Sequence, residues 1–204
     1  MIEKDTYKTI TAVTDSVLFK DKNSKFFGYA FPVTNQDDVK NYLAHLKKEH
    51  HSARHWCYAY QLGTADIAYR VNDDGEPKNT AGMPIYGQIQ SYELTNILIV
   101  VVRYFGGVKL GVSGLINAYR TATQMALTAS KIVEKTIKTH YLIVFEYKNM
   151  NTIMRIIKEK KLTITNQKLE MDCQITISVR KNEAEAVFSS FNRLFEIQIK
   201  EIQP

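Results

Sequence analysis

A glycine-rich elbow with two cations, VRYFGGVKLGVSGL at 102–115, is the stretch whose residue types most suggest chemistry. A run of β-branched residues ends there and a helical pattern begins. Backbone N–H groups at a helix N-terminus favour an anion, and Arg103 and Lys109 would add positive charge. The elbow is therefore a candidate phosphate cradle, with a catalytic loop and a turn that only glycine can make as alternatives.

The spacing of the elbow glycines excludes both familiar nucleotide-binding motifs. A Walker A loop needs GxxxxGK[ST], and Gly106 and Gly111 have that gap, but Val112 stands where the lysine is required. The dinucleotide fingerprint GxGxxG fails because Gly107, Gly111 and Gly114 are spaced four and three apart. In the turn alternative, the glycines supply positive φ values and close packing of strand on helix.

A second candidate is the acidic loop VNDDGEPKNTAGMP at 71–84. Asp73, Asp74 and Gly75 form a good tight-turn sequence, and Glu76 follows directly. The carboxylates of Asp73, Asp74 and Glu76 could ligate Mg²⁺ or serve as acid and base. A solvated turn without a chemical role is the alternative.

The end of the acidic loop predicts another helix N-terminus. Thr80-Ala81-Gly82 is expected to cap a helix that runs to about Tyr92. A second set of backbone N–H groups would then follow directly on the acidic residues. The acidic loop and the elbow could thus form two walls of one cleft.

The segment HHSARHWCY at 50–58 contains three histidines. The i, i+1, i+5 spacing of His50, His51 and His55 lacks the i, i+4 geometry of a helical metal pair, so no metal site is predicted. Arg54 and His55, at the start of a strand, could instead bind an anion or a base. A structural hydrogen-bonding role for the histidine is the alternative.

Nothing in the sequence nominates a nucleophile. No GxSxG, SxxK or Cys–His signature is present. The two cysteines, Cys57 and Cys173, form no CxxC pair and are expected to be buried or idle thiols in a reducing cytoplasm rather than a disulfide or a zinc site. Together with the lack of an apolar leader or a membrane-length apolar run, this predicts a cytoplasmic protein.

The net charge of +6 allows a nucleic-acid partner. The surplus of positive charge is not concentrated in one part of the chain. Residues 1–135 hold 16 Lys and Arg against 13 Asp and Glu, and residues 136–204 hold 11 against 8. A mildly basic solvated surface is the alternative to a real anionic partner.

Periodicity predicts two α+β domains, 1–135 and 136–204, joined by a short polar linker near 134–139. In the second domain, alternating strands over 140–147, 162–170, 172–180 and 196–203 and helices over 149–161 and 182–195 give the ferredoxin-like order β-α-β-β-α-β.

The first domain has a less regular pattern. It predicts hairpins over 16–33 and 55–73, helices over 37–50, 80–92 and 113–131, and an apolar strand over 96–105. That strand should be covered on both faces, because its run of apolar residues is nearly continuous.

Three motifs taken together resemble the IMPACT/YigZ family: ARH at 53–55, DDGEPKNTAGMP at 73–84 and VVRYFGGVKLGVSGLINAY at 101–119. The resemblance covers roughly residues 15–130. It implies that the first domain adopts the fold of the second domain of ribosomal protein S-five, with a left-handed βαβ crossover. The second domain looks like the small domain that bacterial members carry, which is similar to the C-terminal domain of elongation factor G.

The elbow helix departs from the pattern of many bacterial members, KLGxGGLxRAY. Ser113 and Asn117 replace a glycine and an arginine. This puts in doubt any role that rests on that arginine, although Arg120, one turn further on, could partly replace it.

The resemblance implies a role in translation, because eukaryotic relatives are regarded as translational regulators. We therefore expect a non-enzymatic, RNA- or ribosome-associated protein with no cofactor, whose Arg54, His55, Arg103 and Lys109 contact phosphates. One alternative is an Mg-dependent hydrolase or transferase acting on a phosphorylated small substrate, with Asp74 and Glu76 as ligands. The other is a protein-interaction module that binds a regulator.

Overall fold

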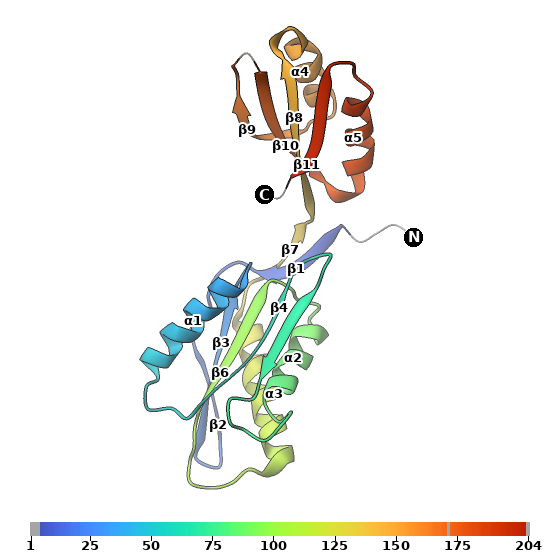
Figure 1. Cartoon of the computed structure of the whole chain (residues 1–204). Helices are drawn as coiled ribbons and strands as arrows, with labels where there is room; N and C mark the ends of the chain where they lie inside the picture. Colours follow the sequence, from blue (N-terminus) through green and yellow to red (C-terminus); the bar gives the residue numbers. More distant parts are fainter. Residues whose placement is uncertain (1–4, 171, 203–204) are drawn as a thin grey trace. The chain divides into compact units, whose positions relative to one another are not determined.

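The computed structural model describes residues 5–170 and 172–202, which divide into two compact units (Figure 1). One unit is Tyr7–Lys135, and the other joins Thr6 to the chain from Thr136 onward. Both combine helices with β-strands, which confirms the mixed α+β class. None of the helices among the described residues is both long and apolar enough to cross a membrane.

The first unit is built on a five-stranded antiparallel sheet in the order β2-β3-β6-β4-β5. Its strands are β2 (Val17–Asp21), β3 (Ser24–Pro32), β4 (His55–Leu62), β5 (Ala68–Asn72) and β6 (Ile97–Tyr104). The two predicted hairpins are confirmed as β2–β3 and β4–β5. Lys22 and Asn23 both have positive φ, 41° and 65°, as a two-residue hairpin turn requires.

The central strand β6 is buried on both faces, as its apolar run predicts. Successive side chains of a strand point to opposite faces. Ile97, Ile99 and Val101 therefore enter one core cluster, and Leu98, Val100 and Val102 enter the other.

Three helices cover the two faces of this sheet, as Figure 1 shows. Helix α1 (Gln36–Glu49), capped by the Asn35 side chain, supplies Val39 and Leu46 to one core cluster. Helices α2 (Gly82–Ser91) and α3 (Gly111–Ala129) pack in the other cluster. All three helices predicted from the sequence are present.

Four connections of the first unit meet at one end of the sheet. The register pairs Lys25 with Tyr104, His55 with Arg103 and Tyr58 with Asn72. This brings together the β2–β3 turn and the segments between α1 and β4, between β5 and α2, and between β6 and α3. We call this the loop end.

The expected linker between the domains is not a loop. Residues 132–136 form β7 (Ile132–Thr136), which pairs with β1 (Thr6–Ile10), and β8 (Lys138–Glu146) begins only two residues later. The sequence of β7 is polar enough to suggest a linker, but Ile132 packs against the core of the first unit.

The second unit has the predicted β-α-β-β-α-β order. Its antiparallel sheet runs β11-β8-β10-β9, the ferredoxin-like arrangement. Its remaining elements are α4 (Met150–Glu159), β9 (Thr163–Lys168), β10 (Asp172–Arg180), α5 (Ala184–Asn192) and β11 (Ile197–Ile202). Residue 203, expected at the end of the last strand, lies outside the described residues.

Candidate functional site

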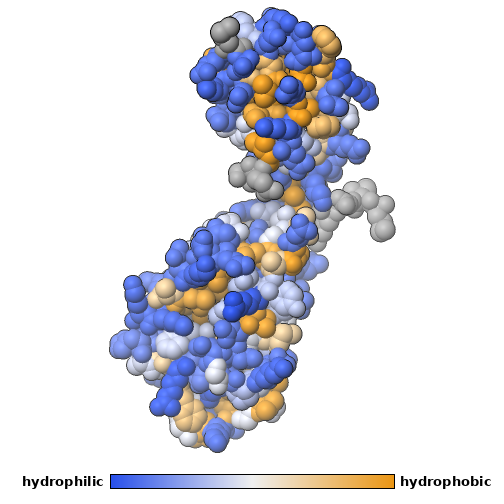
Figure 2. Space-filling model, viewed as in Figure 1, coloured by the Kyte–Doolittle hydropathy of each residue, from blue (hydrophilic) through white to orange (hydrophobic). Residues whose placement is uncertain are grey.

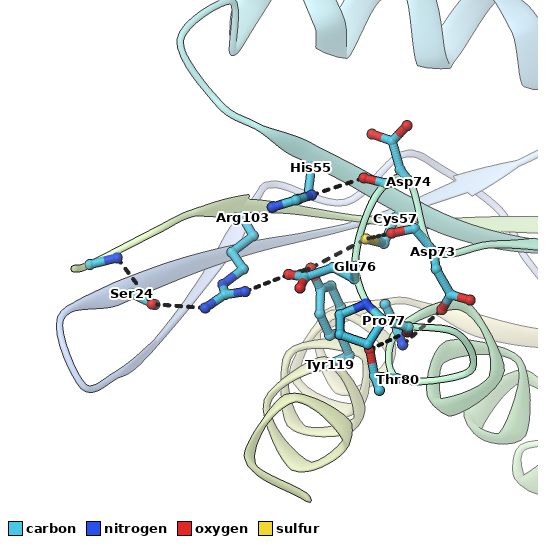
Figure 3. Close-up of polar contacts among 12 residues, drawn as sticks. Ser24, His55, Cys57, Asp73, Asp74, Glu76, Pro77, Thr80, Arg103 and Tyr119 are labelled. Atoms are coloured by element: carbon cyan, nitrogen blue, oxygen red, sulfur yellow. Dashed lines mark hydrogen bonds and ion pairs between the residues drawn. The ribbon is translucent and has the colours of Figure 1, made fainter. Parts of the chain in front are cut away.

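The three sequence segments singled out for chemistry converge at the loop end (Figure 3). His55 of β4 and Phe26 of β3 lie directly opposite Arg103 of β6, on its two sides. The side chain of Glu76, from the acidic loop, bonds to Arg103. Segments 50–58, 73–84 and 103–114 therefore belong to one three-dimensional site.

Arg103 and Glu76 form a buried ion pair. Arg103 Nη1 donates to Glu76 Oε1 at 2.6 Å, and the two side chains are 6% and 4% exposed. The Tyr119 hydroxyl donates to the same oxygen at 2.8 Å, and Arg103 Nη2 donates to Ser24 Oγ at 3.3 Å. The Arg103 charge is thus compensated inside the protein, so this residue is not a free cation for a ligand.

The first carboxylate of the acidic loop, Asp73, caps helix α2 from a distance. Its Oδ1 accepts the N–H groups of Ala81 at 3.0 Å and Gly82 at 2.8 Å, and its Oδ2 accepts that of Asn79 at 2.8 Å. Ala81 occupies the N-cap position, within the predicted Thr80-Ala81-Gly82 segment, but its side chain makes no capping hydrogen bond, so Asp73 supplies the acceptor. The Thr80 hydroxyl donates instead to the carbonyl of Pro77 at 2.6 Å, and a charged carboxylate complements the positive helix end better.

The second carboxylate, Asp74, is held by β4. Its Oδ2 accepts the Trp56 N–H at 2.7 Å. Its carbonyl lies 2.8 Å from His55 Nδ1, which must donate because a carbonyl only accepts. Asp74 and Gly75 both have positive φ, 43° and 86°, as the tight turn demands. His55 therefore has the structural hydrogen-bonding role that the sequence left as an alternative.

The hydrogen bonds of Asp74 and Glu76 can be compared with the hypothesis that these two carboxylates ligate Mg²⁺. The carboxylates of Asp74 and Glu76 are engaged by Trp56 and by Arg103 with Tyr119, rather than pointing together at a common position. Within residues 5–170 and 172–202, no group of three or more His, Cys, Asp or Glu side chains is arranged to hold a metal ion.

Two further buried side chains, Cys57 and Tyr119, are hydrogen-bonded to the acidic loop, and neither was predicted from the sequence as a site residue. Cys57 Sγ lies 3.0 Å from the Asp73 carbonyl and 3.2 Å from the Tyr119 hydroxyl. Burial raises the pKa of the Cys57 thiol and also that of Tyr119, so both stay protonated. Tyr119 looked like an ordinary core position of α3. Its hydroxyl on an apolar helix face was the available signal that a polar partner lies opposite.

The elbow glycines have steric roles. A Cβ on Gly106 would collide with the backbone carbon of Asn23, so β2–β3 and the elbow approach too closely for any side chain. Gly107 and Gly111 have φ values of +84° and +74°. The turn that only glycine can make is therefore present at the elbow.

A cavity of about 330 Å³ lies beside the elbow. Its lining combines the buried pair with the elbow and the start of α3: Glu76, Pro77, Arg103, Phe105, Lys109, Leu110, Gly111, Val112 and Leu115. Helix α3 has no side-chain cap and no acidic residue in its first turn. The positive end of the α3 dipole therefore reaches the cavity wall beside the exposed Lys109.

The loop end carries exposed cations that have no acidic partner. Lys22, Lys25, Arg54, Lys78 and Lys109 are all exposed, and none takes part in an ion pair with another described residue. In the acidic loop, Glu76 is neutralised by Arg103. Asp73 and Asp74 accept only backbone N–H groups among the described residues and keep their negative charges, so these five cations outnumber the two remaining acidic-loop charges. The site therefore has a local positive surplus.

Arg120 does not belong to the group of exposed cations at the loop end. It is exposed on α3, nine residues after Gly111, which places it roughly 13 Å further along the helix axis. Arg120 is also not among the residues that line the cavity beside the elbow.

Comparison with known proteins identifies the family. Residues 22–127 match the Impact N-terminal domain. The chain is similar to an IMPACT family member of Haemophilus influenzae, with 32% identity over 86% of both chains. The chain belongs to the IMPACT family. It is also similar to IMPACT family member YigZ of Escherichia coli, with 34% identity over 71% of this chain and 72% of the relative.

A solved structure supports the fold along nearly the whole chain. A crystal structure of a hypothetical protein is similar over 98% of both chains, with a TM-score of 0.71 and 26% identity. The resemblance to the IMPACT family that the three motifs suggested is therefore confirmed.

Proposed function

We propose that this IMPACT-family chain is a non-enzymatic, RNA- or ribosome-associated regulator of translation, and that the loop end of its first unit contacts RNA phosphates. One observation carries the proposal: five exposed cations at the loop end, without an ion-pair partner among the described residues, outnumber Asp73 and Asp74, the acidic-loop carboxylates that no described cation neutralises. Such an imbalance favours a polyanion, because the acidic residues nearby cannot satisfy the cations.

The α3 N-terminus adds to the attraction at one point of this surface. Its first-turn N–H groups have no side-chain acceptor, and Lys109 directly precedes the helix cap. A phosphate placed there would accept backbone hydrogen bonds and meet a lysine charge. Arg54 and Lys109 belong to different connections, so phosphates of one RNA strand could be contacted at separate points.

The family resemblance directs the proposal to translation rather than to nucleic acids in general. The alternative hydrolase or transferase needs Asp74 and Glu76 as ligands, and both carboxylates hold the fold together instead. The protein-interaction alternative predicts the same basic surface with an acidic protein partner, so the test must separate the two.

The test is filter binding of ribosomes and of structured RNA at two salt concentrations. The variant Arg54→Gln/Lys109→Gln should bind more weakly. Its plot of log K against log salt should be shallower by about 1.4–1.8, because each lost phosphate contact removes about 0.7–0.9 from the slope.

A matched control removes two exposed lysines at the opposite end of the unit. Lys131→Gln/Lys135→Gln lowers the net charge equally and should bind like the unaltered protein. Equal losses in both variants would reduce the effect to net charge and contradict the proposal, as would no retention of RNA or ribosomes at low salt. A ribosomal partner that stays bound after nuclease treatment would favour the protein-interaction alternative.

A further inference from the structure

The cavity beside the elbow has an apolar wall suited to a flat ring. Pro77, Phe105, Leu110, Val112 and Leu115 supply most of its lining. Its volume of about 330 Å³ is at the lower end of the about 300–1,000 Å³ found for ligand pockets. It can therefore take a single small ring system but not a nucleic-acid duplex.

Phe105 offers a surface on which such a ring could stack. Phe105 is 44% exposed although it lies in the elbow itself. The Arg103 guanidinium carbon lies 5.5 Å from its centroid, so the charge is close to the ring while much of the ring stays open. Bases without a partner commonly stack on such an aromatic side chain.

Glu76 gives the cavity a specific polar group. Its Oε1 accepts from both Arg103 and Tyr119, whereas no described residue donates to its Oε2. Oε2 is also not among the fully buried atoms that lack a partner, and Glu76 is one of the residues that line the cavity. In contrast, the unpaired Nε of Arg103 is fully buried and cannot reach a ligand. Glu76, whose contact with Arg103 is drawn in Figure 3, therefore gives the cavity lining a hydrogen-bond acceptor.

The anion-binding features lie on the same cavity wall. Lys109 and Gly111, at the start of α3, line the cavity beside Phe105. A ligand that carries a ring and a phosphate could therefore place the ring on Phe105 and the phosphate at the helix N-terminus. The cavity combines the two halves of a nucleotide-binding site.

We propose that this cavity holds one unstacked base of a single RNA strand, with its phosphate at Lys109 and the α3 N-terminus. The proposal rests on the proposed function and adds to it the form of RNA and the way it is recognised. An acceptor in the cavity lining favours bases with N–H donors on the pairing edge. Guanine has two adjacent donors there, whereas uracil has one between two carbonyl oxygens that a carboxylate repels.

The test is fluorescence anisotropy of the full chain with two labelled RNA pentamers, UUGUU and UUUUU. UUGUU should bind at least about fivefold more tightly, as expected for a carboxylate that pairs with one base edge. The Phe105→Leu variant should bind UUGUU about tenfold more weakly, because a base loses its stacking partner. It should also lose most of the preference between the two pentamers.

The control is Tyr69→Leu, which removes another exposed aromatic side chain of the same unit and should change neither affinity. Thermal unfolding shows that each variant is folded. Salt-dependent binding of both pentamers without a preference, or with no effect of Phe105→Leu, would overturn the cavity proposal and leave the phosphate surface standing. No binding of either pentamer or of structured RNA would overturn both proposals.

Discussion

The guanidinium of Arg103 and the carboxylate of Glu76 meet at 2.6 Å with both side chains almost fully buried. The pair links β6 to the acidic loop. The Tyr119 hydroxyl donates to Glu76, and Arg103 donates to the Ser24 hydroxyl. Burying two charges is costly, and their attraction offsets that cost only when both are present and hydrogen-bonded. The intact pair therefore adds little net stability, whereas removing one partner leaves the other charge buried and uncompensated.

Removing either partner should destabilise the first unit strongly. We expect Glu76→Leu and Arg103→Met each to lower the free energy of unfolding by about 3–5 kcal/mol, because each leaves a buried charge without its partner. The double variant should cost less than the sum of the two. Urea unfolding followed by circular dichroism measures all three.

An exposed ion pair in the same unit provides the control. Lys40 lies 2.8 Å from Asp37, with both side chains mostly exposed, so Lys40→Met should change stability little. Additive losses in the double variant would show that Arg103 and Glu76 act independently and would contradict their coupling as a buried pair.

Most of the fold could be predicted because it follows from local patterns. The alternation in 172–180 and the helical spacing in 182–195 each report which side of an element is buried. The strand at 96–105 shows burial on both faces in its composition alone. The β7 segment could not be identified, because only its pairing with β1 makes a short polar stretch a strand.

The site could be predicted only as a set of segments. The elbow, the acidic loop and the Arg54–His55 stretch were identified, and the sheet register brings them together. Their internal partners were not, because the pairs Arg103–Glu76 and Tyr119–Glu76 join residues 27 and 43 positions apart. No local spacing indicates that the most promising cation and carboxylate neutralise each other.

Asp73 should be important for the stability of α2. Its carboxylate accepts three backbone N–H groups at the start of that helix. Asp73→Ala should lower the free energy of unfolding by about 2 kcal/mol, at the upper end for a helix cap. The exposed Asp66→Ala should stay within about 0.5 kcal/mol of the unaltered protein. If Asp73→Ala and Asp66→Ala lose equal free energy of unfolding in urea, the Asp73 cap contributes nothing to stability.

Three glycine-to-alanine variants should rank by their surroundings. Gly107→Ala should cost about 1 kcal/mol, because φ is +84° but nothing lies within 4 Å of the new Cβ. Gly106→Ala should cost more, since the backbone of Asn23 must move. Gly87→Ala, inside α2 with open space around it, should stabilise the protein by up to about 1 kcal/mol. Thermal melting gives the order, and a Gly106→Ala protein as stable as Gly107→Ala would contradict the close approach.

His50 should make the first unit less stable in mild acid. Its ring lies between the hydroxyls of Tyr29 at 2.5 Å and Tyr104 at 2.9 Å, and burial lowers its pKa below the usual 6.5, although Glu49 partly opposes this. The unfolded chain therefore binds a proton more readily than the folded one. The stability that neutral His50 contributes is fully present above about pH 6.5. It is lost as the pH decreases from there toward the pKa of His50 in the folded protein.

The measurement is urea unfolding at pH 7.5 and pH 5.5 for the unaltered protein and for His50→Gln. The variant should lose less stability between the two values, because the proton that only the unfolded state accepts is gone. His51→Gln removes the exposed neighbouring histidine and should retain the pH dependence of the unaltered protein. If His50→Gln loses as much stability as the unaltered protein, the acid sensitivity originates elsewhere, and the burial of His50 does not account for it.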